Sequence, residues 1–216
     1  MDTYHPTVWR TCRVLANAGR IRCLKAVLEW PSSTVGEIAR RARTAEAVAS
    51  EYLRALQARG LIRAERESRW VRYAPDPDPL VKGSRRLLVA LRRALLAEGR
   101  SEEEIIRSLT AFTHPRRLDI LWCLLRDGQA SFERLCARTR ISQPALSRHL
   151  SKLEARGMIS CADRLWRLSR RPERLAKTIL SLLADSEEDF SHLAKCGSAF
   201  GPSQRREPRA TAREEA

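Results

Sequence analysis

The sequence predicts a mainly helical protein with small β-hairpins, built from two tandem copies of one unit that a long helix joins. Three observations predict this fold class. Amphipathic helical segments end at glycine, strand-turn-strand signals follow two of these segments, and residues 97 positions apart agree along much of the chain. The length of 216 residues suits two small domains.

The clearest amphipathic segment covers residues 141–157. Its apolar residues recur at helical spacing and form one stripe: Leu146, Leu150 and Leu153. We expect the Ser142 hydroxyl to cap the helix by accepting a backbone N–H, and Gly157 to end the helix. Pro144 lies in the first turn, where a missing N–H breaks no helical bond.

The opposite face of this helix is polar and basic, with short side chains near its N-terminus. Such a face suits entry into a DNA major groove. The candidate contacts are Ser142, Gln143, Pro144, Ser147, Arg148, His149, Ser151 and Lys152. His149 flanks the apolar stripe, so it can instead bond a phosphate or a neighbouring backbone group. The segment alone also fits a surface helix with a solvated basic face.

The flanking elements favour the DNA-binding interpretation. We expect helices at about 102–112, 115–126, 131–138 and 142–156, the first of them capped by a Ser101–Glu104 capping box. A hairpin follows, with strands at 158–161 and 165–168 around a turn at 162–164. Three helices and a hairpin in this order predict a winged helix-turn-helix domain over residues 101–170.

The first part of the chain gives the same pattern. One or two helices are expected over residues 6–30, with a break at Asn17–Gly19 and a turn at 30–33. A helix at 34–41 begins with a Thr34–Glu37 capping box, and a helix at 45–59 ends at Gly60. Strands at 61–65 and 70–73 bracket a turn at 66–69. These elements predict a first winged helix-turn-helix domain over residues 1–75.

The two domains align without a gap from about residue 15 to 62 at an offset of 97, as in Arg20 with Arg117, Leu53 with Leu150 and Gly60 with Gly157. The helix at 45–59 corresponds to the helix at 142–156, and we call both of them recognition helices. The candidate DNA contacts of the first recognition helix are Thr44, Ala47, Ser50, Glu51 and Arg54. Glu51 occupies the position that corresponds to Arg148 in the second recognition helix, and phosphate repels its carboxylate. We therefore expect the second domain to supply most of the DNA affinity.

The rest of the chain connects and follows these domains. Residues 76–100 contain a proline-rich break, continuous with Pro75, and a connector helix over 80–97. Residues 171–196 are expected to be a C-terminal helical segment, and residues 197–216 a disordered tail. Each domain is thus followed by an apolar helix that needs a partner.

The charge balance points to an anionic partner. The chain has 41 basic and 26 acidic residues, and the basic excess lies before residue 173. Nucleic acid is the usual partner of such a chain. There is no apolar run that could span a membrane and no signal peptide, so we expect a cytoplasmic protein. We find no catalytic constellation and expect neither an enzyme nor a cofactor.

The hairpins are rich in arginine, which suits phosphate and minor-groove contacts. The candidate wing contacts are Arg66, Arg69, Arg72, Arg164 and Arg167. A merely solvated basic hairpin is the alternative. The six cysteines are scattered, and we expect each to be a small buried side chain. The five tryptophans are expected to pack in the core or on the hairpins.

Several of these segments together resemble the ArsR/SmtB (arsenic-repressor-like) family of winged-helix regulators. The likeness is specific over residues 105–170, and its motifs are His114-Pro-Arg-Arg-Leu-Asp-Ile-Leu121, Phe132-Glu-Arg-Leu135, Ile141-Ser-Gln-Pro-Ala-Leu-Ser-Arg-His-Leu150 and Leu153-Glu-Ala-Arg-Gly-Met-Ile159. It is weaker over 10–75. The resemblance implies transcription control by binding double-stranded DNA. The family usually acts as homodimers, so two units in one chain imply a pseudo-dimer, or else a homodimer of the chain.

Many members of that family sense a metal through a Leu-Cys-x-Cys motif before the recognition helix. Here the place reads Leu135-Cys136-Ala137-Arg138, and an arginine replaces the second thiol. The trailing helix offers Glu173 and Asp185 but no histidine before His192. We therefore expect no metal, while a redox role of Cys136 stays open.

Two other functions remain open at this point. A winged helix can dock proteins, and the acidic first recognition helix could be such a surface. The chain could also bind DNA without sequence preference. The uncharged Ser142, Gln143 and Ser147 favour base recognition over pure charge.

Overall fold

The structure is a computed structural model that describes residues 8–186 and residue 190. The first seven residues, most of the predicted segment beyond 186, Cys196 and the predicted tail 197–216 lie outside this range.

The described chain has two halves with the same order of elements up to the end of each hairpin. The first contains α1 (Val8–Leu15), α2 (Ala18–Glu29), β1 (Ser33–Thr34), α3 (Val35–Arg41), α4 (Glu46–Gln57), β2 (Arg63–Glu67) and β3 (Trp70–Ala74). The connector contains α5 (Ser84–Arg92) and a π-helix, η1 (Arg93–Ala97). The second contains α6 (Glu102–Thr110), α7 (Pro115–Asp127), β4 (Gln129–Ser131), α8 (Phe132–Thr139), α9 (Gln143–Glu154), β5 (Ile159–Ala162), β6 (Leu165–Leu168) and α10 (Arg174–Ala184). A mainly helical chain with small antiparallel sheets fits the winged helix-turn-helix class.

Each half holds one three-stranded antiparallel sheet. The strand orders are β1-β3-β2 and β4-β6-β5. The short strands β1 and β4 therefore each pair with the second strand of the hairpin in their half. Ser33 lies opposite Tyr73 in the first sheet, and Ala130 lies opposite Trp166 in the second. Strands β1 and β4 were not predicted from the sequence, because two or three residues before a helix are too short to show strand periodicity.

The helical stripes form the core of each half. Leu53 and Leu56 of α4 are fully buried, as are Leu146 and Leu153 of α9. Gly60 and Gly157 follow these helices with φ angles of +64° and +66°, as predicted for the glycines that end them. Both predicted capping boxes are confirmed, at the start of α3 and of α6.

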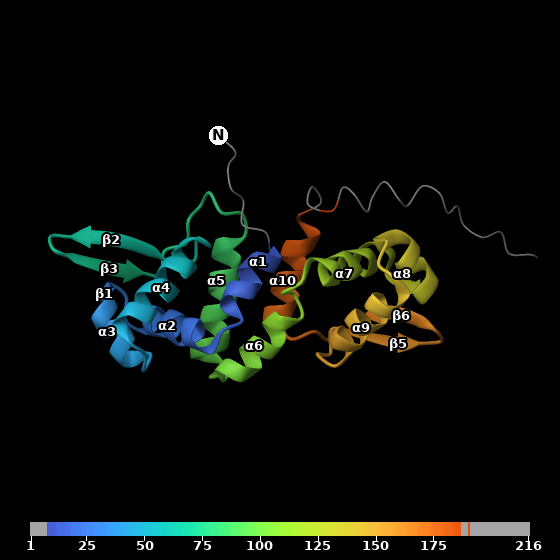
Figure 1. The fold of residues 1–216 in the computed structure, drawn as a ribbon, viewed down its shortest axis with the longest axis horizontal. Coiled ribbons are helices and arrows are strands. Elements are labelled where there is room, and N and C mark those ends of the chain that lie inside the picture. The colour runs from blue at the N-terminus through green and yellow to red at the C-terminus, as the bar shows by residue number, and fades with distance from the viewer. Residues whose placement is uncertain (1–7, 187–189, 191–216) are drawn as a thin grey trace, which may run out of the picture.

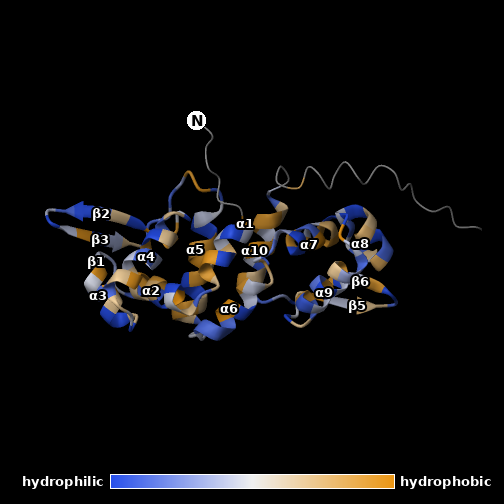
Figure 2. Cartoon of the chain, in the orientation of Figure 1, coloured by the Kyte–Doolittle hydropathy of each residue, from blue (hydrophilic) through white to orange (hydrophobic). Residues whose placement is uncertain are grey.

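The two halves meet through four central helices. Helix α5 packs against α10, and α1 packs against α6. In Figure 1 these helices lie at the centre of the molecule, and the two hairpins point outward at opposite ends. Figure 2 shows apolar residues gathered along α5 and α10. Polar bonds add to this packing: Lys82 Nζ donates to the Asp185 carbonyl at 3.0 Å, and Arg86 donates to Ser181 Oγ at 2.7 Å.

The connector helix begins later than the predicted residue 80. Gly83 caps α5 with a φ of +82°, and a Cβ there would lie 2.7 Å from Leu182 Cδ2 of α10. The turn before α5 is therefore set by a contact distant in sequence. The last turn, η1, is a π-helix and not the continuous α-helix that apolar spacing suggested.

Two local predictions about helix starts were wrong. No backbone N–H of the described chain donates a cap bond to the Ser142 hydroxyl. Pro144, at the second position of α9, lacks the N–H that such a hydroxyl often accepts. Gly19 lies inside α2 and not in the break, which falls at Ala16–Asn17. A Cβ at Gly19 would clash with the Tyr52 ring.

The first strand of the first hairpin lies two residues later than predicted, since β2 covers Arg63–Glu67 and not residues 61–65. Strand β2 runs to Glu67 and β3 begins at Trp70, so only Ser68 and Arg69 form the turn. The mixed charges of this segment hid its strand character, since neither face is apolar.

The expectation that every cysteine is buried was also wrong. Cys12, Cys23 and Cys123 are buried, whereas Cys136 is partly exposed and Cys161 is exposed. Cys161 lies in β5, whose pattern after Ile159 is exposed throughout. Trp30 and Trp70 are also about half exposed, at 45% and 51%.

The packing predicts unequal costs for apolar truncations. Leu150→Ala should lower the free energy of unfolding by about 2–5 kcal/mol, because it leaves a cavity under α9. Val89→Ala, at a position 62% exposed, should change it by less than about 0.5 kcal/mol. Urea denaturation measures both, and equal losses would contradict this core.

Candidate nucleic-acid interface

Helix α9 presents most of its predicted contacts to solvent. Its leucines face inward, and on the outer side Ser142, Gln143, Pro144, Ser147, Arg148, Ser151 and Lys152 are all exposed. Arg148 Nε donates to the Pro144 carbonyl at 3.3 Å, and Ser151 Oγ donates to the Ser147 carbonyl at 3.0 Å. These are local bonds within α9, so the exposed guanidinium needs no rearrangement of the fold to contact a duplex.

His149 is the exception among the predicted contacts of α9. Its ring is half-buried and lies 4.7 Å from the ring of His114, which caps α7 by accepting the Arg116 backbone N–H. Burial, followed by the charge of His114, lowers the pKa of His149 from 6.5 to about 4. At neutral pH its imidazole is therefore uncharged and adds nothing to the positive field of the helix.

Helix α4 occupies the corresponding place in the first half but presents different chemistry. Ala47, Glu51 and Arg54 are exposed, while Thr44 and Ser50 are half-buried. Arg54 folds back on its own helix, with its Nε 3.4 Å from the Ser50 carbonyl. The outer face thus combines an exposed carboxylate with a cation that bonds within its own helix.

Two arginines that were not singled out from the sequence stand just before α4 and α9. Arg43 and Arg140 are exposed, and both have a left-handed backbone, with φ angles of +51° and +53°. A non-glycine residue in this region costs about 1 kcal/mol or more. The repeat could have revealed the pair, since the two residues are 97 positions apart. Both place a cation beside the N-terminus of a helix with an exposed polar face.

The wing arginines differ in how they are engaged. Arg66 and Arg69 are exposed near the tip of the first hairpin, with Arg69 over the Trp70 ring. Arg72 is tied to the body of the protein, because it pairs with Glu67 and donates to the Ser32 carbonyl at 2.9 Å. In the second hairpin Arg164 is exposed and Arg167 is half-buried. The side chains most available to an anion are therefore Arg66, Arg69 and Arg164.

The described residues contain no group of three or more His, Cys, Asp or Glu side chains that could hold a metal ion. Arg138, at the position of the missing second thiol, donates to an Asp127 carboxylate oxygen at 2.6 Å. Burial raises the pKa of the Cys136 thiol, which disfavours the reactive thiolate. Among the described helices, none is long and apolar enough to cross a membrane.

Comparisons with known proteins bear on the second half. Residues 114–160 match the family model described as bacterial regulatory protein, arsR family. The match runs from the start of α7 to the start of β5, and it indicates a helix-turn-helix of a DNA-binding transcription regulator. No curated protein sequence matches the chain. A solved structure of human N-acetylserotonin methyltransferase in complex with SAM is similar at 13% identity and a TM-score of 0.30. That likeness covers 69% of this chain and 39% of the other, and it supports no conclusion about activity.

The histidine pair predicts a pH dependence of stability. Below about pH 6.5 the unfolded chain protonates at position 149, whereas the folded chain resists until its lower pKa, near 4. The free energy of unfolding should therefore fall as the pH drops from 6.5 to 4. His149→Gln should flatten this fall in urea denaturation, while Ser147→Ala should leave it unchanged. His114, whose pKa is also lowered by burial, contributes to the remaining slope, as do Glu37, Glu104 and Glu133, whose pKa values are lowered by hydrogen bonds.

Proposed function

We propose that this protein is a transcription regulator that binds one duplex DNA site with two recognition helices, α4 and α9, and represses by occupancy. The observation that carries the proposal is the exposed polar and basic face of α9, backed by buried leucines, within the segment that matches the arsR-family model. The proposal assigns binding to the chain and no catalysis.

Equivalent bonds in the two halves support a tandem repeat of one domain. Arg20 Nη1 donates to the Val14 carbonyl at 3.2 Å, and Arg117 Nε donates to the Ala111 carbonyl at 2.9 Å. Asn17 and His114 cap the next helix in each half with their side chains. All three pairs keep the offset of 97 found in the sequence. Shared sheet order and shared bonds are hard to obtain from unrelated folds.

The central helices support an intramolecular pseudo-dimer. Two of the pairings that join the halves, α5 with α10 and α1 with α6, bring together helices from corresponding places in the repeat. In Figure 1 the elements of one half have their counterparts across the centre of the molecule. Such an arrangement suits a duplex with two half-sites, because dimeric regulators match the symmetry of their operators.

The two recognition helices should contribute unequally. Helix α9 exposes the two cations Arg148 and Lys152, whereas α4 exposes the carboxylate Glu51 beside the single cation Arg54. A carboxylate can accept from cytosine N4 but opposes the phosphate field. We propose that the second domain supplies most of the affinity and that the first refines the site. Selection from random duplexes would give two different half-sites.

The asymmetry predicts opposite effects at corresponding positions. Arg148→Ala should cost about 1–3 kcal/mol of binding free energy if the guanidinium contacts a guanine. Glu51→Ala should leave the affinity unchanged or raise it, because a repelled charge is removed. Gel-shift titration on the selected duplex measures both. The reverse order of effects would contradict the dominance of the second domain.

The wings predict a change in salt dependence. Replacing both Arg66 and Arg69 by glutamine should reduce the slope of log affinity against log salt by about one unit for each phosphate that the hairpin no longer neutralises. Arg63→Gln is the matched control, because Arg63 already pairs with Asp76 at 3.0 Å. Equal slopes for all variants would mean that the first hairpin is only solvated. Binding that unlabelled duplex fails to compete would favour a protein-docking role instead.

A further inference from the structure

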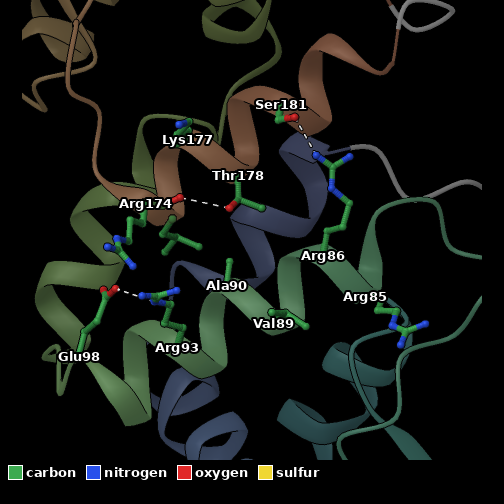
Figure 3. Close-up of a pocket in the computed structure, with 11 residues that line it drawn as sticks. Arg85, Arg86, Val89, Ala90, Arg93, Glu98, Arg174, Lys177, Thr178 and Ser181 are labelled. Carbon is green, nitrogen blue, oxygen red and sulfur yellow. Dashed lines mark hydrogen bonds and ion pairs between the residues drawn. The ribbon is translucent and has the colours of Figure 1, made fainter.

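A groove with no part in the proposed DNA contacts lies between the connector and α10. It has a volume of about 570 Å³, which is within the usual size of small-molecule sites. Figure 3 shows α5 and η1 on one side of it and α10 on the other. Its walls therefore come from both helices that follow a winged unit.

The groove has an excess of unpaired cations. Five lining residues are basic and one, Glu98, is acidic. Arg86 pairs with Asp185, and Arg93 Nε lies 3.3 Å from Glu98 Oε1. Within the described chain, no ion pair or side-chain hydrogen bond engages the cationic groups of Arg174 and Lys177. Both residues line the groove, and in Figure 3 Arg174 is directed toward the Glu98 end while Lys177 lies at the far edge of α10, so Arg174 is the unpaired cation best placed to meet an anionic group and Lys177 adds positive charge nearby.

The floor of the groove is apolar. Val89 of α5 is 62% exposed, and it lines the groove together with Ala90 and the buried Leu175 of α10. A bare phosphate would pair with the cations but would leave the exposed apolar side chain in contact with water. The groove suits a molecule with an apolar body and an acidic head.

The backbone at one end of the groove is unusual. Arg93 lines the groove and begins the π-helix η1, which extends to Ala97. Single π-turns are rare, and they often occur at functional sites, because the wider turn displaces side chains from the helical register. Here the turn carries the Arg93–Glu98 pair, which closes that end of the groove.

We propose that this groove binds a small organic anion, a molecule with a carboxylate, sulfonate or phosphate head and an apolar body. The head pairs with Arg174, the charge of Lys177 adds to the attraction, and the body lies on Val89 and Ala90. Because the ligand contacts both the connector and α10, it bridges the two halves of the chain. Binding of the ligand is independent of DNA, so the site can be tested separately from the proposed function.

The test is calorimetric titration of the full chain with naphthalene-1-carboxylate, and with 1-naphthalenemethanol as the uncharged analogue. The carboxylate should bind with one site per chain and the alcohol much more weakly. The double variant Arg174→Gln, Lys177→Gln should weaken binding by about tenfold or more, since a hydrogen bond between charged groups is removed. Val89→Glu should do the same by placing a carboxylate on the floor. These positions are exposed or half-buried at the surface, so the variants should fold.

The matched control is Arg40→Gln, an exposed cation of α3 that does not line the groove. It should leave the affinity for the carboxylate unchanged. Failure of the wild-type chain to bind at millimolar carboxylate, equal affinity for the alcohol, or an equal loss in Arg40→Gln would each overturn the proposal. A dimer in sedimentation that Val89→Glu dissociates would assign the groove to a second copy of the chain and overturn it as well.

Discussion

The packing of α5 against α10, with α1 against α6, is the constraint on which the arrangement of this protein depends. A helix with an apolar face follows the hairpin of each half, α5 after β3 and α10 after β6, and these two helices cover each other. Burial of apolar area is the main driving force of such packing. Because these contacts fix the two halves, they also fix where α4 and α9 stand relative to each other. Under the proposed function, this interface would determine the spacing of the two half-sites on DNA.

Much of this could be predicted from periodicity. The leucines of α4 and α9, the glycines that end those helices and both capping boxes are local signals, and each is where the sequence placed it. The missed features depend on partners elsewhere in the chain. Leu182 packs closely against Gly83, Tyr73 pairs with Ser33 of β1, and the ring of His114 packs against that of His149. No window of sequence contains both members of such a pair.

The candidate site was predictable in its outer face but not in the state of its charges. Arg72 and Arg66 look alike in the sequence, yet one is bonded to Ser32 and Glu67 while the other is exposed. The left-handed backbone at Arg43 and Arg140 could not be predicted, because arginine rarely adopts this conformation. The buried positions of α4 and α9 are apolar in both halves, as in Leu53 with Leu150, whereas most outer positions differ, as in Glu51 with Arg148. Changes on the outer face can therefore alter recognition at little cost in stability.

The covalent connector keeps the two halves together at any protein concentration. A regulator assembled from two separate subunits falls apart on dilution, and its occupancy of DNA then depends on the square of the subunit concentration. Residues 76–100 tie the halves covalently, so their effective local concentration is fixed by geometry and not by expression level. If the proposed pseudo-dimer is the active form, even a few copies of this chain in a cell would each be fully assembled.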